Sequence, residues 1–291
     1  MAKINVNIYD IKSKEYPEKL RHIKRPPEKL HVIGTLPDEN KKTVAIVGAR
    51  AASDYGLTLA KTIAKTLSKN NVQVVSGMAL GVDTSSHVGA LEADEKTYAV
   101  LGCGVDICYP AYNQVVYDKI IESGGGIISE YEEGTTPLPG LFPARNRIIS
   151  GLSDVVIVVD GKKNSGSLIT ADFALEQGRT VFACPGRVGD ALSIGPNNLI
   201  KQGAYILTSV DDVLSHLGLI CDGILPKETI DITKLDYNEK LVYDVLESSA
   251  IHLDEIVDKT KLPVVKVMNV LMSLELMRVV EMTMPNYYRK V

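Results

Sequence analysis

Short apolar runs recur along the first three quarters of the chain, and a glycine, a proline or an acidic residue follows each. The runs are Val44–Val47, Val72–Ser76, Thr97–Leu101, Ile127–Ser129, Val155–Val159 and Thr180–Cys184. Runs of this kind, apolar at nearly every position, are typical of strands that a parallel sheet buries on both faces. Segments with apolar residues at helical spacing lie between them, for example over 57–67 and 167–177. Strands that alternate with helices predict an α/β fold with a doubly wound, mostly parallel sheet.

The pattern changes at both ends of this region. Residues 1–40 are interrupted by prolines, and we expect a short N-terminal arm that packs on the next domain, which spans 41–218. Residues 219–237 form a hydrophilic stretch around Gly223 and Pro226 and are expected to be a linker. Beyond it, 238–291 show three short helical patterns and two short strands, which together predict a small winged-helix-like domain.

Composition narrows the function classes only slightly. The chain has 291 residues, 45% of them hydrophobic and 23% charged, with a formal net charge of −4. A nucleic-acid partner must therefore be held by a local basic patch. The four cysteines (Cys103, Cys108, Cys184 and Cys221) have no metal-ligand spacing and are expected to be buried thiols in a reducing compartment. No signal-peptide core and no membrane-spanning run is present, so we expect a cytoplasmic protein.

The pattern of residues 43–56 predicts a strand, a tight turn and a helix. Gly48 ends the apolar run, Arg50 follows in the turn, and Ser53 is placed to cap the next helix. Ligands bind at the carboxyl ends of strands in open α/β sheets, and helix N-termini attract phosphates. The alternative interpretation is a connecting turn with a surface arginine.

Two further glycine-containing turns follow later strands. Gly77 begins a turn that leads to Asp83 and His87, which could be polar groups of a crevice; the favoured interpretation is an N-cap and an ordinary helix residue. Ser165, Gly166 and Ser167 precede a helix and form a plausible anion nest. The chain lacks both G-x-G-x-x-G after the first strand and a P-loop motif, so we expect no cofactor, and no metal.

The segment 142–153 contains the closest grouping of candidate binding residues in the sequence. Arg145, Asn146 and Arg147 fall within one helical turn, and Phe142 lies just before them. Arginine suits phosphate because its planar fork donates two hydrogen bonds, and an aromatic ring offers a base a stacking surface. The alternative is a helix fixed by arginine salt bridges to Glu130 or Asp160. Both could hold, with one arginine structural and the other free.

Taken together, these motifs resemble the DNA-processing protein A (DprA/Smf) family. They are GxRxxSxYG at 48–56, SGxAxGVD at 76–83, FPxRNRIISGLS at 142–153, SGSLITA at 165–171, PG at 185–186 and GPNNLIKQG at 195–203. The resemblance covers about residues 16–217 and implies an extended Rossmann-like domain that is usually dimeric. It differs at Asp160-Gly161, where relatives often have Glu-Ala.

By this resemblance the protein would be a non-catalytic single-stranded DNA-binding protein. It would protect incoming strands during natural transformation, help load RecA recombinase, and form a homodimer. The expected DNA-binding residues are Gly48, Arg50, Ser53, Gly77, Phe142, Arg145, Asn146, Arg147, Ser165, Gly166 and Ser167; no catalytic residue is expected.

Two other function classes remain open. A Rossmann-like nucleotide phosphoribohydrolase would use the Ser165–Ser167 loop with Glu176. A winged-helix DNA-binding regulator would use the tail, where the third helical pattern offers Lys266 and Asn269 but also Glu275. The preceding pattern is acidic, so we expect a partner-binding tail rather than sequence-specific reading of duplex DNA.

Overall fold

The computed structural model describes residues 5–219, 235–247, 249–276 and 279–290. The chain divides into two compact units, 1–221 and 222–291. The expected linker around Gly223 and Pro226, together with Cys221, lies outside the described residues.

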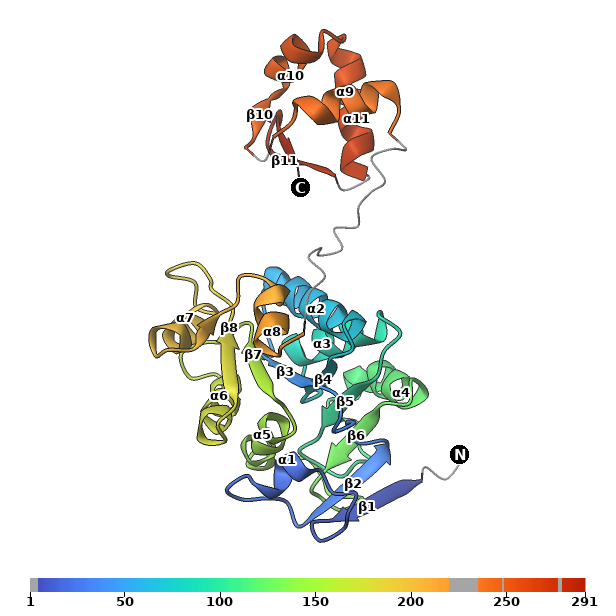
Figure 1. Ribbon diagram of the computed structural model, residues 1–291, viewed down its shortest axis with the longest axis vertical. Helices are drawn as coiled ribbons and strands as arrows, with labels where there is room; N and C mark the ends of the chain where they lie inside the picture. The colour runs from blue at the N-terminus through green and yellow to red at the C-terminus, as the bar shows by residue number, and fades with distance from the viewer. Residues whose placement is uncertain (1–4, 220–234, 248, 277–278, 291) are drawn as a thin grey trace. The chain divides into compact units, whose positions relative to one another are not determined.

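The first unit is a nine-stranded sheet covered by helices on both faces (Figure 1). Its strands are β1 (Val6–Asp10), β2 (Lys29–Gly34), β3 (Thr43–Val47), β4 (Gln73–Ser76), β5 (Thr97–Val100), β6 (Gly126–Ser129), β7 (Val155–Val158), β8 (Thr180–Ala183) and β9 (Tyr205–Ile206). Its helices are α1 (Glu18–Arg21), α2 (Asp54–Lys69), α3 (Val82–Leu91), the 3₁₀ turn η1 (Ala111–Asn113), α4 (Gln114–Glu122), α5 (Leu141–Gly151), α6 (Gly166–Glu176), α7 (Ile194–Lys201) and α8 (Val210–His216).

The strand order is β1-β2-β6-β5-β4-β3-β7-β8-β9, and every pair from β6 to β9 is parallel. The order reverses at β3, because β4 lies on one side of it and β7 on the other. This is the doubly wound arrangement that the apolar runs predicted, with its topological switch point between β3 and β7.

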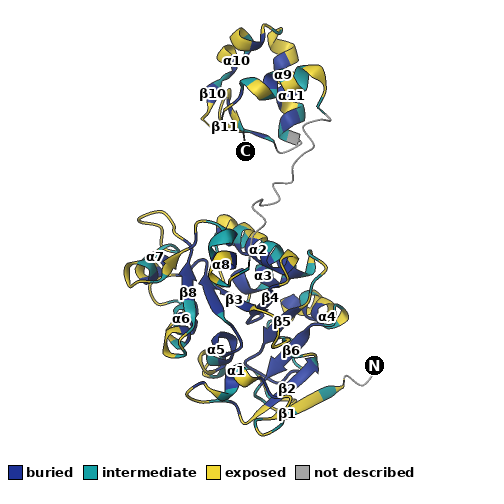
Figure 2. Cartoon of the chain, in the orientation of Figure 1, coloured by how far each residue is buried: buried dark blue, intermediate teal, exposed yellow. Residues whose placement is uncertain are grey.

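The alternation of side chains along β3 shows how the two faces are built. Ala45 and Val47 pack under α5 and α6, whereas Val44 and Ile46 pack under α2, α3 and α8. All of these side chains are buried, because the helices cover both faces (Figure 2). Strands buried on both faces leave no polar alternation, which explains the continuous apolar runs in the sequence.

The N-terminal segment does more than pack on the body. β1 and β2 form an antiparallel hairpin, and β2 pairs antiparallel with β6, so the segment extends the sheet by two strands. Leu20 and Ile23 pack closely against Gly151, where an added Cβ would lie 2.6 Å from a Leu20 methyl carbon. The arm therefore braces the end of α5.

In its described residues, the second unit contains three helices and a three-stranded antiparallel sheet. Its elements are α9 (Tyr237–Val245), β10 (Ile251–His252), α10 (Leu253–Thr260), α11 (Val264–Leu276), β11 (Val280–Met284) and β12 (Tyr287–Lys290), with strand order β10-β12-β11. A core that includes Val242, Ile256, Leu271 and Leu274 holds the helices together. The helices and hairpin confirm the winged-helix-like prediction, and the short β10 is an addition to it.

Candidate nucleic-acid interface

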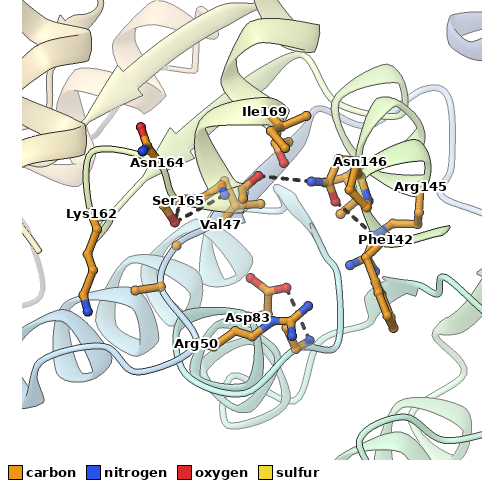
Figure 3. A pocket seen from close by; sticks show the side chains of 18 of the residues that line it. Val47, Arg50, Asp83, Phe142, Arg145, Asn146, Lys162, Asn164, Ser165 and Ile169 are labelled. Atoms are coloured by element: carbon orange, nitrogen blue, oxygen red, sulfur yellow. Dashed lines mark hydrogen bonds between the residues drawn. The ribbon is translucent and has the colours of Figure 1, made fainter. Parts of the chain in front are cut away.

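A crevice of about 640 Å³ opens where β3 and β7 end, at the switch point of the sheet. Eight of the eleven expected DNA-binding residues line it: Gly48, Arg50, Phe142, Arg145, Asn146, Ser165, Gly166 and Ser167. In Figure 3, Lys162, Asn164 and Ser165 lie on one side of the opening and Phe142, Arg145 and Asn146 on the other. Segments more than a hundred residues apart in sequence therefore meet at one site.

Arg50 reaches the crevice from the turn after β3. The turn is compact, because a Cβ on Gly48 would lie 2.5 Å from Val82 and one on Gly81 would lie 2.3 Å from the Ala49 oxygen. Gly81 also has φ = +81°, which glycine adopts without strain. The Arg50 side chain is exposed, and its guanidinium carbon lies 5.4 Å from the centre of the Phe142 ring. This distance fits a cation–π contact.

An aromatic pair forms one wall. The rings of Phe142 and Tyr109 stack with their centres 5.4 Å apart and an angle of 28° between their planes. Tyr109 is 42% exposed and also lines a smaller recess of about 100 Å³, which Gly77, Leu80 and Arg145 share. Sequence reasoning did not select Tyr109, although an aromatic residue in the loop after β5 was a usable signal.

Arg145 is fixed in the floor of the crevice and is only 5% exposed. Its Nη1 donates to the Gly77 oxygen at 2.6 Å and to the Val100 oxygen, and its Nε donates to Asn146 Oδ1 at 3.2 Å. Burial lowers the pKa of Arg145, but the guanidinium stays charged at neutral pH. Arg145 therefore ties α5 to the ends of β4 and β5 and keeps a positive charge at the site.

Asp83 lies close to the same cation. A Cβ on Gly77 would be 2.7 Å from both Arg145 Nη2 and Asp83 Oδ2, so glycine is required between the two charged groups. Burial raises the pKa of Asp83 while the charge of Arg145 opposes that rise. Gly81, rather than Asp83, is the N-cap of α3; Asp83 sits in the first turn and accepts from the Ala79 N–H at 3.3 Å.

The N-terminus of α6 forms the opposite wall. Ser165 caps the helix, and its hydroxyl lies 2.9 Å from that of Ser167. Asn146 Nδ2 donates to the Gly166 oxygen at 3.2 Å, which joins α5 to this turn. Lys162, which the sequence analysis did not select, is exposed just before the helix. A helix N-terminus flanked by a lysine favours an anion such as a phosphate group.

Three expected residues lie outside the main crevice. Arg147 makes a bidentate salt bridge to Glu130, with both N–O distances 2.6 Å, in a separate groove between α5 and α6. Arg145 and Arg147 are two residues apart, which turns their side chains to opposite sides of the helix. Ser53 is the N-cap of α2 and bonds to Asp160, and Gly77 lines the smaller recess. For Arg147 the alternative interpretation, a structural salt bridge to Glu130, is therefore the one that the structure shows.

Burial also shifts the pKa values of a histidine and of three cysteines in the first unit. Burial lowers the pKa of His87 to about 3, and its Nδ1 lies 2.8 Å from Thr97 Oγ1. Burial raises the pKa of Cys103 and Cys108 to about 11 and that of Cys184 to about 12. Among the described residues, no group of three or more His, Cys, Asp or Glu could hold a metal ion, and no helix is long and apolar enough to cross a membrane.

Comparison with known proteins identifies close relatives. The family model for DNA recombination-mediator protein A matches residues 7–218, and that for the DprA winged helix domain matches residues 227–283. The chain is 45% identical over 203 residues to DNA processing protein DprA of Streptococcus pneumoniae, which covers 69% of this chain and 71% of that protein. It is 40% identical over 213 residues to protein Smf of Escherichia coli, covering 73% of this chain and 57% of that protein.

Two solved structures share the fold. The crystal structure of DprA from Streptococcus pneumoniae superposes with a TM-score of 0.68 at 42% identity, covering 72% of this chain and 73% of that chain. The structure of DprA from Helicobacter pylori, described for its single-stranded DNA binding mode, gives a TM-score of 0.65 at 32% identity and covers 74% of this chain and 96% of that chain.

Proposed function

The chain belongs to the DprA/Smf family of DNA-processing proteins, and we propose that it binds single-stranded DNA in the crevice at the switch point of its sheet. The observation that carries this proposal is the grouping of Arg50, Arg145 and Lys162 with the stacked rings of Phe142 and Tyr109. Cations that follow a phosphate backbone, together with rings on which bases stack, are what single-strand binders combine. The relative from Helicobacter pylori, which is described as binding single-stranded DNA, supports the same ligand.

The test is fluorescence anisotropy with labelled oligonucleotides of equal length. We expect tighter binding to a single strand than to a blunt duplex, because the aromatic wall can stack only on unpaired bases. Affinity should fall with salt, by roughly 0.7 in logarithmic slope for each phosphate contacted. Tighter binding to the duplex would contradict the proposal.

We further propose that the protein acts without catalysis. His87 is buried and neutral, and the described cysteines are protonated at neutral pH, so neither type of residue supplies a ready base or nucleophile. The phosphoribohydrolase alternative needs Glu176 beside the Ser165–Ser167 turn, but Glu176 lies in the separate groove with Arg147. Incubation with nucleoside monophosphates should release neither base nor phosphate. Release that disappears in Glu176→Ala would favour the enzyme instead.

Within the cell we propose that the protein protects incoming strands during natural transformation and helps load RecA recombinase, as a homodimer in the cytoplasm. The edge strand β9 exposes Tyr205 (57%) and Ile206 (49%), which suits self-association. Light scattering at micromolar concentration should report a dimer. RecA filament formation on a strand coated with single-strand binding protein should start faster when this protein is added.

A further inference from the structure

A carboxylate of the protein itself occupies the position where nucleotide-binding folds of this type hold phosphate. In dinucleotide-binding sheets the pyrophosphate lies at the N-terminus of the helix that follows the first strand at the switch point. The corresponding helix here is α2, which follows β3 and is 16 residues long. Its N-terminus is filled by Asp160, which comes from the end of the neighbouring strand β7.

The contacts of Asp160 are those of a bound anion. Its Oδ2 accepts from the Ser53 backbone N–H at 2.9 Å and from the Ser53 hydroxyl at 2.8 Å. The Ser53 hydroxyl in turn accepts from the Gly56 N–H at 2.9 Å. Asp160 is only 7% exposed, so the carboxylate is embedded at the helix end rather than lying over it.

Gly56 is what allows the carboxylate to approach. A Cβ at this position would lie 2.2 Å from Asp160 Oδ2 and 2.6 Å from its carboxyl carbon. The space in the first turn of α2 is therefore shaped around the carboxylate. Asp54, the other carboxylate at the start of α2, is exposed and does not fill this space.

We propose that Asp160 determines ligand selectivity beside the crevice, by closing the N-terminus of α2 to the phosphates of free nucleotides. The same bonds fix the end of the turn that carries Arg50, since Ser53 lies three residues beyond it. A phosphate that enters the crevice must then use Arg50, Arg145 and the N-terminus of α6. The inference rests on the proposed function only for the claim that the selected ligand is a strand.

The experiment asks whether removing the carboxylate opens an anion site. Inorganic pyrophosphate is titrated by calorimetry into the wild-type protein and into Asp160→Ala. We expect Asp160→Ala to bind pyrophosphate at least tenfold more tightly than the wild type does, because the Ser53 N–H and hydroxyl lose their acceptor at the helix N-terminus. Its thermal midpoint should rise by roughly 3 °C or more in saturating pyrophosphate, and that of the wild type should not.

Two control variants distinguish the opening of the α2 N-terminus from a general destabilisation of the protein. Asp154 lies just before β7 as Asp160 lies just after it, and Asp154 also accepts a backbone N–H, that of Thr43 at 2.8 Å, but not at a helix N-terminus. Asp154→Ala should therefore gain no pyrophosphate affinity. Asp160→Asn keeps the position filled and should gain less than threefold. If Asp160→Ala does not fold, the same titration is made with Asp160→Ser.

A failure of this inference can be distinguished from a failure of the proposed function. Equal pyrophosphate affinity in the wild type and in the opened variant would overturn the inference, as would an equal gain in Asp154→Ala or in Asp160→Asn. Failure of the wild type to bind single strands would instead overturn the proposed function, because the pyrophosphate titration contains no DNA.

Discussion

The crevice of the first unit and the outer face of α11 in the second unit differ in the chemistry that they present. The crevice gathers Arg50, Lys162 and two aromatic rings around a hollow. The face of α11 presents exposed apolar side chains: Val264, Val265, Met268 and Met272. In winged-helix proteins the corresponding helix commonly enters a DNA groove with polar side chains. Each unit therefore carries a different kind of surface, and the residues proposed to bind DNA belong to the first unit.

Arg50 also differs in its partners from two cations of the second unit. In the second unit Lys259 pairs with Glu255 at 2.7 Å, and Arg289 pairs with Glu281, so these charges are already matched within the protein. Arg50 lies over an aromatic ring and makes no ion pair with any described residue. The charge of Arg50 is therefore free to meet a phosphate, whereas those of Lys259 and Arg289 are matched. The predictions that follow test this contrast, beginning with the largest effect.

Arg50→Ala should weaken single-strand binding by roughly thirtyfold. A hydrogen bond to a charged group contributes about 1.5–3 kcal/mol, and Arg50 supplies such bonds to phosphate. Circular dichroism should show an unchanged fold, because the side chain is exposed. Arg289→Ala in the second unit is the matched control and should change affinity by less than twofold in the same anisotropy assay. Equal losses in the two variants would erase the contrast between the units.

Arg147→Ala should lower stability rather than affinity. The variant leaves Glu130 without its bidentate partner at a site where the two side chains are only 14% and 17% exposed. Loss of one partner of a buried pair costs several kcal/mol, and with this partial exposure we expect about 2 kcal/mol by urea denaturation. The folded variant should bind a single strand as the wild type does. A large loss of affinity without a loss of stability would show that Arg147 contacts DNA.

Acid should destabilise the first unit through His87. Its folded pKa of about 3 lies below the ordinary value of 6.5, so between these values the unfolded chain binds a proton that the folded chain does not. Stability therefore rises with pH in this window and is lost as pH falls, by about 2 kcal/mol from pH 6.5 to pH 5. Calorimetry should show a flatter pH dependence in His87→Gln.

Tyr109→Ala should weaken single-strand binding by roughly fivefold, since a stacked base contributes about 1–3 kcal/mol and Phe142 remains. Tyr237→Ala in the second unit removes a ring that is 79% exposed and should have no measurable effect on anisotropy. A fivefold loss in the second variant and none in the first would place the stacking surface in the second unit.

Removal of the second unit should have the smallest effect. A protein ending near residue 219 keeps all the residues of the crevice, so its affinity for a single strand should remain within twofold of the full chain. Anisotropy on the purified fragment, with its fold checked by circular dichroism, measures this. A folded fragment that loses most of its affinity would show that the crevice is not the main DNA site.

The parallel core could be predicted from sequence because its strands are buried on both faces. Runs such as Val155–Val159 carry that signal in consecutive residues, and the alternation with helices then fixes the doubly wound order. β1 carries no such signal, since it is a largely exposed edge strand whose Ile8 is 57% exposed. Its pairing depends on β2, and that of β2 on β6, far along the chain.

The positions of the turns at the candidate site could be predicted from the sequence, but the directions of its side chains could not. Gly48 and Gly77 directly follow apolar runs, so their place at the strand ends could be inferred. Arg145 and Arg147 fall in one motif, yet helical geometry turns them about 200° apart, which the motif alone does not express. Tyr109 escaped notice because the loop after β5 has no periodic pattern and reaches Phe142 only through the fold.

The pairing of β2 with β6 has a consequence for synthesis of the protein. His31 in β2 lies opposite Ser129 in β6, so the partner strand is made roughly a hundred residues after the hairpin. At typical elongation rates of about 5–20 residues per second, the hairpin leaves the ribosome several seconds before its partner exists. During that interval its inner edge is unpaired and open to other chains. The hairpin therefore completes its hydrogen bonding only after a strand about a hundred residues further along the chain has been made.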